Sequence, residues 1–151
     1  IGIALGGYLA DRFGAHDPKW FLWTTAVALI ICVPLNIVVF ISTNSTTALL
    51  AMILPVLLGN FYQATTFSQT QGISALRMRA VAAGILLFIL NIIGLGLGPQ
   101  LVGILSDALN PEYGDESLRY ALLICSLVYL WAAVHYFIAG RHLGGDLVVE
   151  G

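Results

Sequence analysis

Polar side chains gather in the second half of one apolar segment, residues 48–71. From Asn60 onward this segment is rich in amides and hydroxyls, whereas its first half is almost wholly apolar. At about 100° per residue, one helical face carries a single set of side chains: Asn60, Gln63, Phe67, Thr70 and Gln71. Amides and hydroxyls form and release hydrogen bonds to a small molecule. The pattern therefore predicts a face that lines a substrate cavity.

A second interpretation of this polar face stays open. An amide in the middle of a bilayer is costly unless it meets protein or water. The side chains could therefore bond to neighbouring helices and hold them together, as polar groups in membrane proteins often do. We favour the cavity because the polar run is long and mixes amide, hydroxyl and aromatic groups.

Groups that do covalent chemistry are missing from the apolar segments. Apart from Arg119 at the edge of the last segment, these segments contain no Asp, Glu, Lys or Arg. There is no His-Glu-x-x-His metal pair and no Gly-x-Ser-x-Gly nucleophile turn. His135 is the nearest titratable candidate, and we expect it to be packed or interfacial. The sequence thus favours a protein that is not an enzyme and that uses no metal and no cofactor.

The composition indicates that these side chains are held by membrane helices. Of 151 residues, 59% are hydrophobic and 9% are charged, and the mean hydropathy is +0.93. Soluble domains carry about 25% charged residues, and six Lys and Arg make no nucleic-acid surface. A span needs about 20 apolar residues, which predicts transmembrane helices at 20–41, 48–71, 80–105 and 118–139. Residues 1–10 are expected to be the end of a helix, and the chain a fragment of a longer protein. The fold class is all-α, a polytopic membrane helix bundle.

The basic residues alternate between the connections. Arg12 and Lys19, then Arg77 and Arg79, then Arg141 fall on one side of the predicted bundle. Because cytoplasmic loops are enriched in Lys and Arg, we expect connections 11–19 and 72–79 and the tail 140–151 to be cytoplasmic. The expected location is the plasma (inner) membrane.

Small residues cluster in the third complete span. Gly94 and Gly98 are spaced so that two helix backbones can approach closely, and Gly103 continues the pattern. Pro99 removes one helical hydrogen bond and should bend the helix. Gly94, Gly98, Pro99 and Gly103 are therefore predicted to form a helix interface.

Two motifs resemble those of the major facilitator superfamily. The opening segment carries Gly7, Leu9, Asp11, Arg12 and Gly14, which resembles the loop after the second and eighth helices of these transporters. Gly94-x3-Gly98-Pro99-x2-Val102-Gly103 resembles the signature of the fifth helix in antiporters of the family, whose counterpart is the eleventh. Arg77-Met78-Arg79-Ala80 and Ser117-Leu118-Arg119-Tyr120-Ala121-Leu122 are similar to the spinster-like subgroup.

The resemblance implies the C-terminal part of a twelve-helix fold, from the end of helix eight through helix twelve. It implies a secondary transporter of a small organic solute or a lipid-like amphiphile, working by alternating access, with protons as one candidate coupling ion. Gly7, Asp11, Arg12 and Gly14 would form a gating loop. The implied partners are the lipid bilayer, the substrate and the missing N-terminal half, with no nucleic acid. The alternative is a non-transporting protein of the same fold, receptor-like or an assembly subunit.

Overall fold

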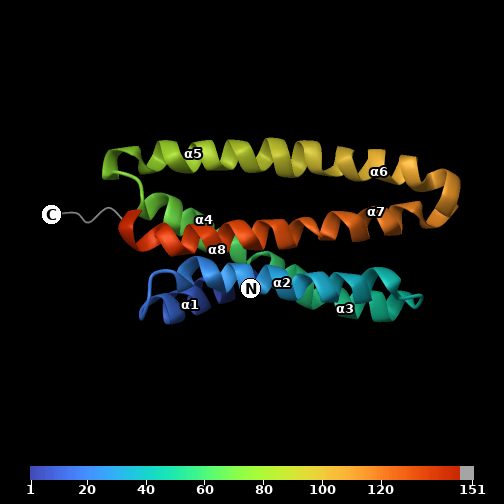
Figure 1. Cartoon of the computed structure of the whole chain (residues 1–151), viewed down its shortest axis with the longest axis horizontal. Coiled ribbons are helices and arrows are strands. Elements are labelled where there is room, and N and C mark those ends of the chain that lie inside the picture. The colour runs from blue at the N-terminus through green and yellow to red at the C-terminus, as the bar shows by residue number, and fades with distance from the viewer. Residues whose placement is uncertain (147–151) are drawn as a thin grey trace.

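The computed structural model describes residues 1–146, which fold into a bundle of long helices (Figure 1). The α-helices and the short η segments between them follow one another in chain order. Their bounds are α1 Gly2–Gly14, α2 Trp20–Ile41, α3 Ser45–Gly59, α4 Phe61–Gly72, η1 Leu76–Met78, α5 Arg79–Ile89, η2 Leu90–Leu97, α6 Gly98–Tyr113, η3 Gly114–Glu116, α7 Ser117–Ser126 and α8 Val128–Asp146.

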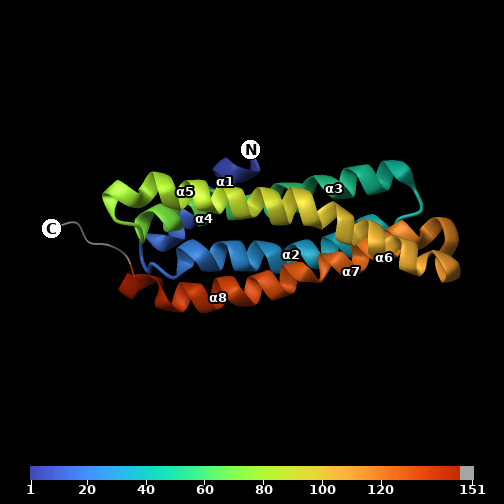
Figure 2. The ribbon, with the colours of Figure 1, turned by 90° about the horizontal axis from the view of Figure 1, so that it is seen from above.

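The chain passes along the bundle four times after α1 (Figures 1 and 2). α2 forms one pass and α3 with α4 the next. α5, η2 and α6 form a third, and α7 with α8 a fourth. Three continuous helical stretches are long and apolar enough to cross a membrane: Trp20–Ile41, Ser45–Gly72 and Leu76–Gly145. The last stretch holds two passes, because the chain reverses between α6 and α7 (Figure 1).

The connections lie at two opposite ends of the bundle. One end holds the α1–α2 and α4–α5 connections and the end of α8 (Figure 1); we call it the basic end. The other holds the α2–α3 and α6–α7 connections. There Arg119 of α7 pairs with Glu116 and donates from Nη2 to the Ser42 carbonyl at 3.3 Å. The chain reverses at Gly114, whose φ of 52° is readily adopted only by glycine.

Several helices continue past the apolar segments that predicted them. α1 ends at Gly14 rather than at residue 10, and α8 runs through Asp146 rather than ending at 139. A helix is not limited to apolar residues, and Arg12 and Arg141 in these extensions are good helix formers. The hydropathy of the sequence therefore marks only the apolar part of each helix. The predicted tail, 140–151, is thus helical as far as Asp146; residues 147–151 lie outside the described part.

α2 is the central helix. It packs along α8 and α3 and also contacts α1, α4 and α7. Thr25 and Cys32, the largest fully buried side chains, both belong to it. The Thr25 and Thr65 hydroxyls lie 2.6 Å apart and join α2 to α4, while Cys32 Sγ donates to the Pro55 carbonyl at 3.5 Å and joins α2 to α3.

A stripe of small residues allows α1 to pack closely against α3 and α4. Gly2, Gly6, Ala10 and Gly14 recur every fourth residue and are the buried residues of this helix. A Cβ atom at Gly6 would lie 2.8 Å from the Phe61 Cα atom, closer than atoms can approach without a shift. Glycine therefore permits the close approach of α1 to α4.

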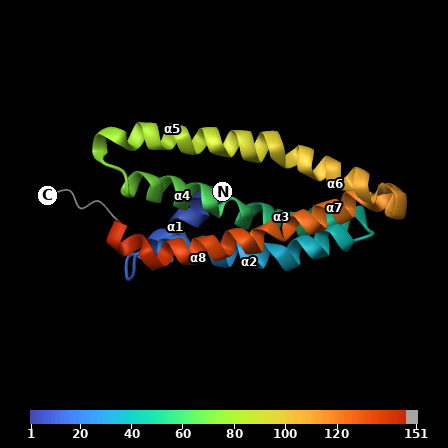
Figure 3. The same ribbon diagram turned by 45° about the horizontal axis from the view of Figure 1, so that its top comes forward.

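The α5–η2–α6 rod stands apart from α2. In the described part of the chain it packs on α4 at one end and on α7 at the other. Its middle, Leu90–Leu97, is a π-helix, and the rod changes direction where this segment meets α6 (Figure 3). Pro99 lies in the first turn of α6. A proline has no N–H to donate to the preceding turn, which accounts for a change of helical register at this point.

Candidate functional site

The second pass is interrupted in its middle, at Asn60. α3 ends at Gly59 and α4 begins at Phe61, with Asn60 at φ −85° and ψ −2° between them. Its side chain bonds on both sides of the break: Nδ2 donates to the Val56 carbonyl at 2.6 Å, and Oδ1 accepts from Gln63 Nε2 at 3.4 Å. Asn60 keeps a helical backbone conformation, and its N–H donates to the Leu57 carbonyl at 3.4 Å, so the helix changes locally at this residue without unwinding.

α4 has one packed face. Phe61, Thr65 and Gln69 recur every fourth residue and are at most 9% exposed. Thr65 meets Thr25 of α2, and it also donates to a carbonyl one turn earlier in its own helix, at 3.2 Å from Phe61 O.

The predicted cavity face is roughly opposite this packed face. At 100° per residue, Gln63, Phe67 and Thr70 point about 140–160° away from Thr65. Asn60, Gln63, Phe67 and Thr70 are half-buried and Gln71 is exposed. The five residues thus lie on the side of α4 that is roughly opposite its contacts with α1 and α2. Their role as substrate contacts stays a prediction.

Two hydroxyls of the polar run bond to neighbouring helices, as the interpretation of the polar face as a packing surface predicts. The Thr65 hydroxyl pairs with Thr25 of α2, and the Thr66 hydroxyl lies 2.6 Å from the Tyr136 hydroxyl of α8. The amides behave differently. The Asn60 and Gln63 side chains bond within their own segment of helix, and in the described residues they form no hydrogen bond with α2 or α8. Packing and an open polar face therefore coexist on one helix.

The predicted gating residues lie in the last turns of α1. Gly7 is half-buried and Gly14 is buried, with Gly14 so close to the Phe21 ring that a Cβ atom would lie 2.6 Å from it. Asp11 and Arg12 are exposed and form no ion pair with another residue between 1 and 146. Any latch formed by these two side chains therefore involves a partner outside the described residues.

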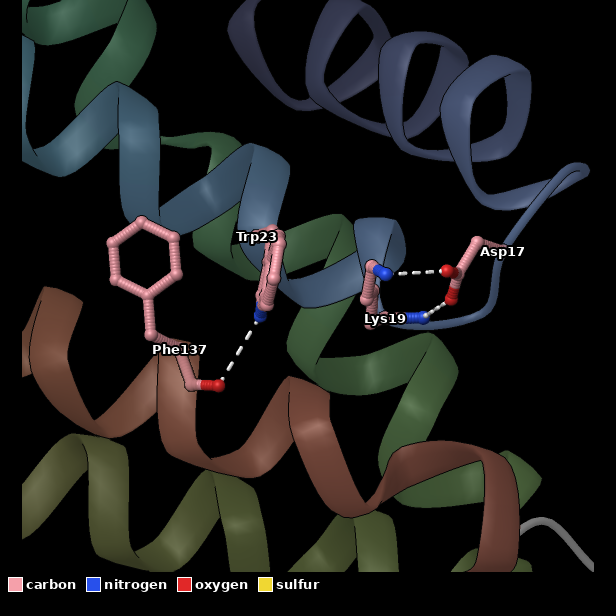
Figure 4. Close-up of polar contacts among 4 residues, drawn as sticks. All are labelled: Asp17, Lys19, Trp23 and Phe137. Carbon is pink, nitrogen blue, oxygen red and sulfur yellow. Dashed lines mark hydrogen bonds and ion pairs between the residues drawn. The ribbon is translucent and has the colours of Figure 1, made fainter.

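The ion pair of this connection belongs to Asp17 and Lys19 instead (Figure 4). Lys19 Nζ lies 2.6 Å from Asp17 Oδ2 and 5.2 Å from the centre of the Trp23 ring. Trp23 Nε1 in turn donates to the Phe137 carbonyl of α8 at 3.1 Å. The hydrogen bond from the Lys19 side chain lowers the pKa of the exposed Asp17 carboxyl below its ordinary value of 3.8. The cluster fixes the start of α2 against α8.

The glycine-rich segment lines a cavity. A space of about 850 Å³ separates the rod from α2, α7 and α8, and Gly94, Gly98 and Pro99 are among its lining residues. A Cβ atom at Gly94 or Gly103 would meet nothing within 4 Å. In the described residues the close helix approaches occur on α1 and at Gly140, where a Cβ atom would lie 2.5 Å from the Trp23 ring. The predicted helix interface at Gly94, Gly98, Pro99 and Gly103 remains a prediction about contacts beyond these residues.

Sequence reasoning missed two features. One is the small-residue stripe of α1, whose spacing of four from Gly2 to Gly14 was a readable signal. The other is a smaller cavity at the basic end, lined by Thr70 and Gln69 of α4 and by His135 and Tyr136 of α8. Its signal in the sequence was weaker, because no local sequence pattern indicates which residues of α4 lie beside which residues of α8. Among residues 1–146, no three His, Cys, Asp or Glu side chains are grouped to hold a metal ion.

Comparisons with known proteins agree on the class of the fold. No family model matches the chain. The chain is 29% identical over 151 residues to an MFS-type efflux pump of Mycolicibacterium smegmatis, a match that covers 99% of this chain and 35% of the pump. The structure is similar to that of a bacterial homologue of the human lysosomal transporter Spinster in an inward-facing and occupied conformation, with a TM-score of 0.76 and 22% identity. That match covers 99% of this chain and 40% of the homologue.

The chain therefore has the fold of part of a major facilitator transporter, and it spans about a third of the curated relative's length. The resemblance predicted from the loop and glycine motifs is confirmed by both matches. Both similar proteins are named as a pump or a homologue of a transporter, and neither is named as an enzyme. Together with the three apolar stretches, this identifies an integral membrane protein.

Proposed function

We propose that the full-length protein is a secondary active transporter that moves a small organic solute or a lipid-like amphiphile by alternating access. Support comes from the fold and from the similarity to an efflux pump. In this scheme a second half of the protein, outside this chain, completes the central site and supplies the coupling groups, for which protons are one candidate ion.

The observation that carries the proposal is the divided surface of α4. On its packed face, Phe61 and Thr65 contact neighbouring helices, and Gln69 is buried on the same side. The opposite face nevertheless carries a second polar set, beginning at the helix break at Asn60. Polar groups at such depth need protein, water or substrate as partners. A water-filled substrate path against Asn60, Gln63, Phe67, Thr70 and Gln71 supplies them.

The proposed orientation places the basic end in the cytoplasm of a cell whose plasma (inner) membrane holds the protein. Arg12, Lys19, Arg77, Arg79 and Arg141 all belong to that end, and such an excess is typical of cytoplasmic loops. Asp11 and Arg12 would then form the gating latch on the cytoplasmic side, against a helix of the other half.

The test is thiol accessibility in the full-length protein with Cys32→Ala and Cys125→Ala. Asn60→Cys should react with an impermeant thiol reagent applied from either membrane face, because an alternating cavity exposes it to each side in turn. Thr65→Cys is the matched control, five residues on and 2% exposed on the packed face; it should stay unlabelled.

A second candidate function is a non-transporting receptor-like or assembly protein. The Thr25–Thr65 and Thr66–Tyr136 contacts favour this candidate, because in them polar groups of α4 pack against neighbouring helices. It predicts that Asn60→Cys is unlabelled from both faces, a result that would remove the transport proposal.

A further inference from the structure

A cavity of about 350 Å³ lies at the basic end, between α2, α4 and α8. Its apolar lining includes Leu22 of α2, Ile73 directly after α4, and Leu143 of α8. Its polar lining includes Gln69 of α4 and His135 and His142 of α8. The volume is at the lower end of the range for small-molecule sites, which are mostly apolar with a few convergent polar groups.

Gln69 is the decisive residue of this cavity. It is only 9% exposed, yet no residue between 1 and 146 forms a hydrogen bond with its amide. The amide is not sealed in the protein either, because no unpaired side-chain atom in the described residues is fully buried. Both amide atoms therefore keep some accessible surface, and Gln69 is one of the residues that line the cavity. Thr65, one turn earlier on the same face, has its partner in Thr25, whereas the Gln69 amide is left for an occupant of the cavity.

The other polar groups of the lining indicate which hydrogen-bonding groups a ligand needs. His135 Nδ1 lies 2.9 Å from the Trp131 carbonyl, and since a carbonyl only accepts, this nitrogen carries the proton. In the tautomer that carries its proton on Nδ1, the other ring nitrogen, Nε2, is an acceptor. Gln69 adds one donor group and one acceptor. The complementary ligand group is one that both donates and accepts, such as a hydroxyl or an amide.

The described lining of the cavity carries no fixed charge. Among residues 1–146, none of those that line the cavity is Asp, Glu, Lys or Arg. A permanently charged headgroup would lose its water without gaining a fixed counter-charge, which is unfavourable. The apolar side chains Leu22, Ile73 and Leu143 instead suit a short hydrocarbon segment. Together these features select an uncharged amphiphile.

We propose that this cavity is a binding site for an uncharged amphiphile whose hydroxyl or amide headgroup pairs with Gln69. It is distinct from the open face of α4, because only Thr70 belongs to both sets. The site does not depend on the transport proposal, since it is defined by groups within α2, α4 and α8 and its occupancy is measured without flux.

The experiment uses the full-length protein in phosphatidylcholine nanodiscs and a monoacylglycerol that carries a photoreactive diazirine in its acyl chain. Labelled peptides are located by mass spectrometry. The expected result is saturable labelling within residues 66–73, at the end of α4, and within residues 135–143 of α8. Gln69→Leu should raise the half-saturating concentration about tenfold, the factor expected for one lost hydrogen bond in a buried site. Gln100→Leu, the same change at an exposed position of α6, should leave it unchanged.

A second variant keeps the test decisive if Gln69→Leu fails to fold. Ala139→Phe fills the cavity from α8 and leaves the amide in place; it should abolish the labelling while the protein stays monodisperse. Absence of saturable labelling in the unmodified protein would overturn the proposal, as would labelling that survives both variants. Tighter labelling by a diazirine fatty acid than by the monoacylglycerol would overturn the assignment of an uncharged headgroup.

Discussion

Asp11 is the residue whose position bears most directly on gating. It lies in the last turn of α1, where a carboxylate faces the negative end of the helix dipole. Its charge is therefore no help to α1 itself, and it forms no ion pair within residues 1–146. The fold should therefore survive neutralisation of Asp11. Any loss of transport in such a variant would report on a contact beyond these residues.

We expect Asp11→Asn to slow transport by about two- to fivefold, the factor equivalent to about 0.3–1 kcal/mol for a carboxylate at a partner helix's N-terminus. Insertion and thermal stability should be unchanged. The measurement is initial uptake or efflux in proteoliposomes. Asp17→Asn is the control, because it removes a charge of the same connection whose exposed pair with Lys19 contributes little. Equal rates in the two variants would remove the latch.

Asp17 also gives a pH-dependent prediction. Because Lys19 lowers its pKa, the ion pair is fully formed above the ordinary carboxyl value of 3.8 and is lost as the pH falls through the lower folded value. Lys19→Met should return the Asp17 pKa towards 3.8, as measured by carboxyl carbon NMR titration. An unchanged pKa in that variant would show that Lys19 is not the cause.

At the scale of the element, α1 depends on glycine in a way that α5 does not. Gly6→Ala would place a Cβ atom 2.8 Å from the Phe61 backbone. Overpacking of this kind costs about 1–3 kcal/mol, so the melting temperature in detergent should fall. Gly84→Ala in α5 meets nothing within 4 Å and should leave the melting temperature equal or slightly higher, since alanine favours a helix. The opposite ranking would show that α1 does not pack closely on α4.

At the scale of the whole molecule, the two ends of the bundle should face opposite sides of the membrane. Cysteines at His16 and Ala75 lie at the basic end, and cysteines at Thr43 and Asp115 at the other; all four positions are exposed. In a background without Cys32 and Cys125, the first two should react only from the cytoplasmic side and the last two only from the outside. Labelling of Thr43→Cys and Ala75→Cys from one side would contradict the proposed topology.

The sequence by itself determined the class of the protein and its broad arrangement. Hydropathy and charge are properties of short stretches of sequence and need no knowledge of tertiary contacts. They were therefore enough to predict the apolar segments and the alternation of basic residues, and local motifs were enough for the major facilitator resemblance. α2 begins and ends at Trp20 and Ile41, where its apolar segment does. The polar face of α4 was also readable, because helical periodicity fixes which side chains share a face.

Only the tertiary structure decided which polar residues are already paired. Thr65 meets Thr25 forty residues earlier, and Thr66 meets Tyr136 seventy residues later, distances in the chain that no local pattern spans. The same contacts leave the Gln69 amide without a partner and place Gln69 among the lining residues of the cavity between α2, α4 and α8. A buried polar group is defined by what its neighbours offer, and its neighbours here are set by how the helices pack.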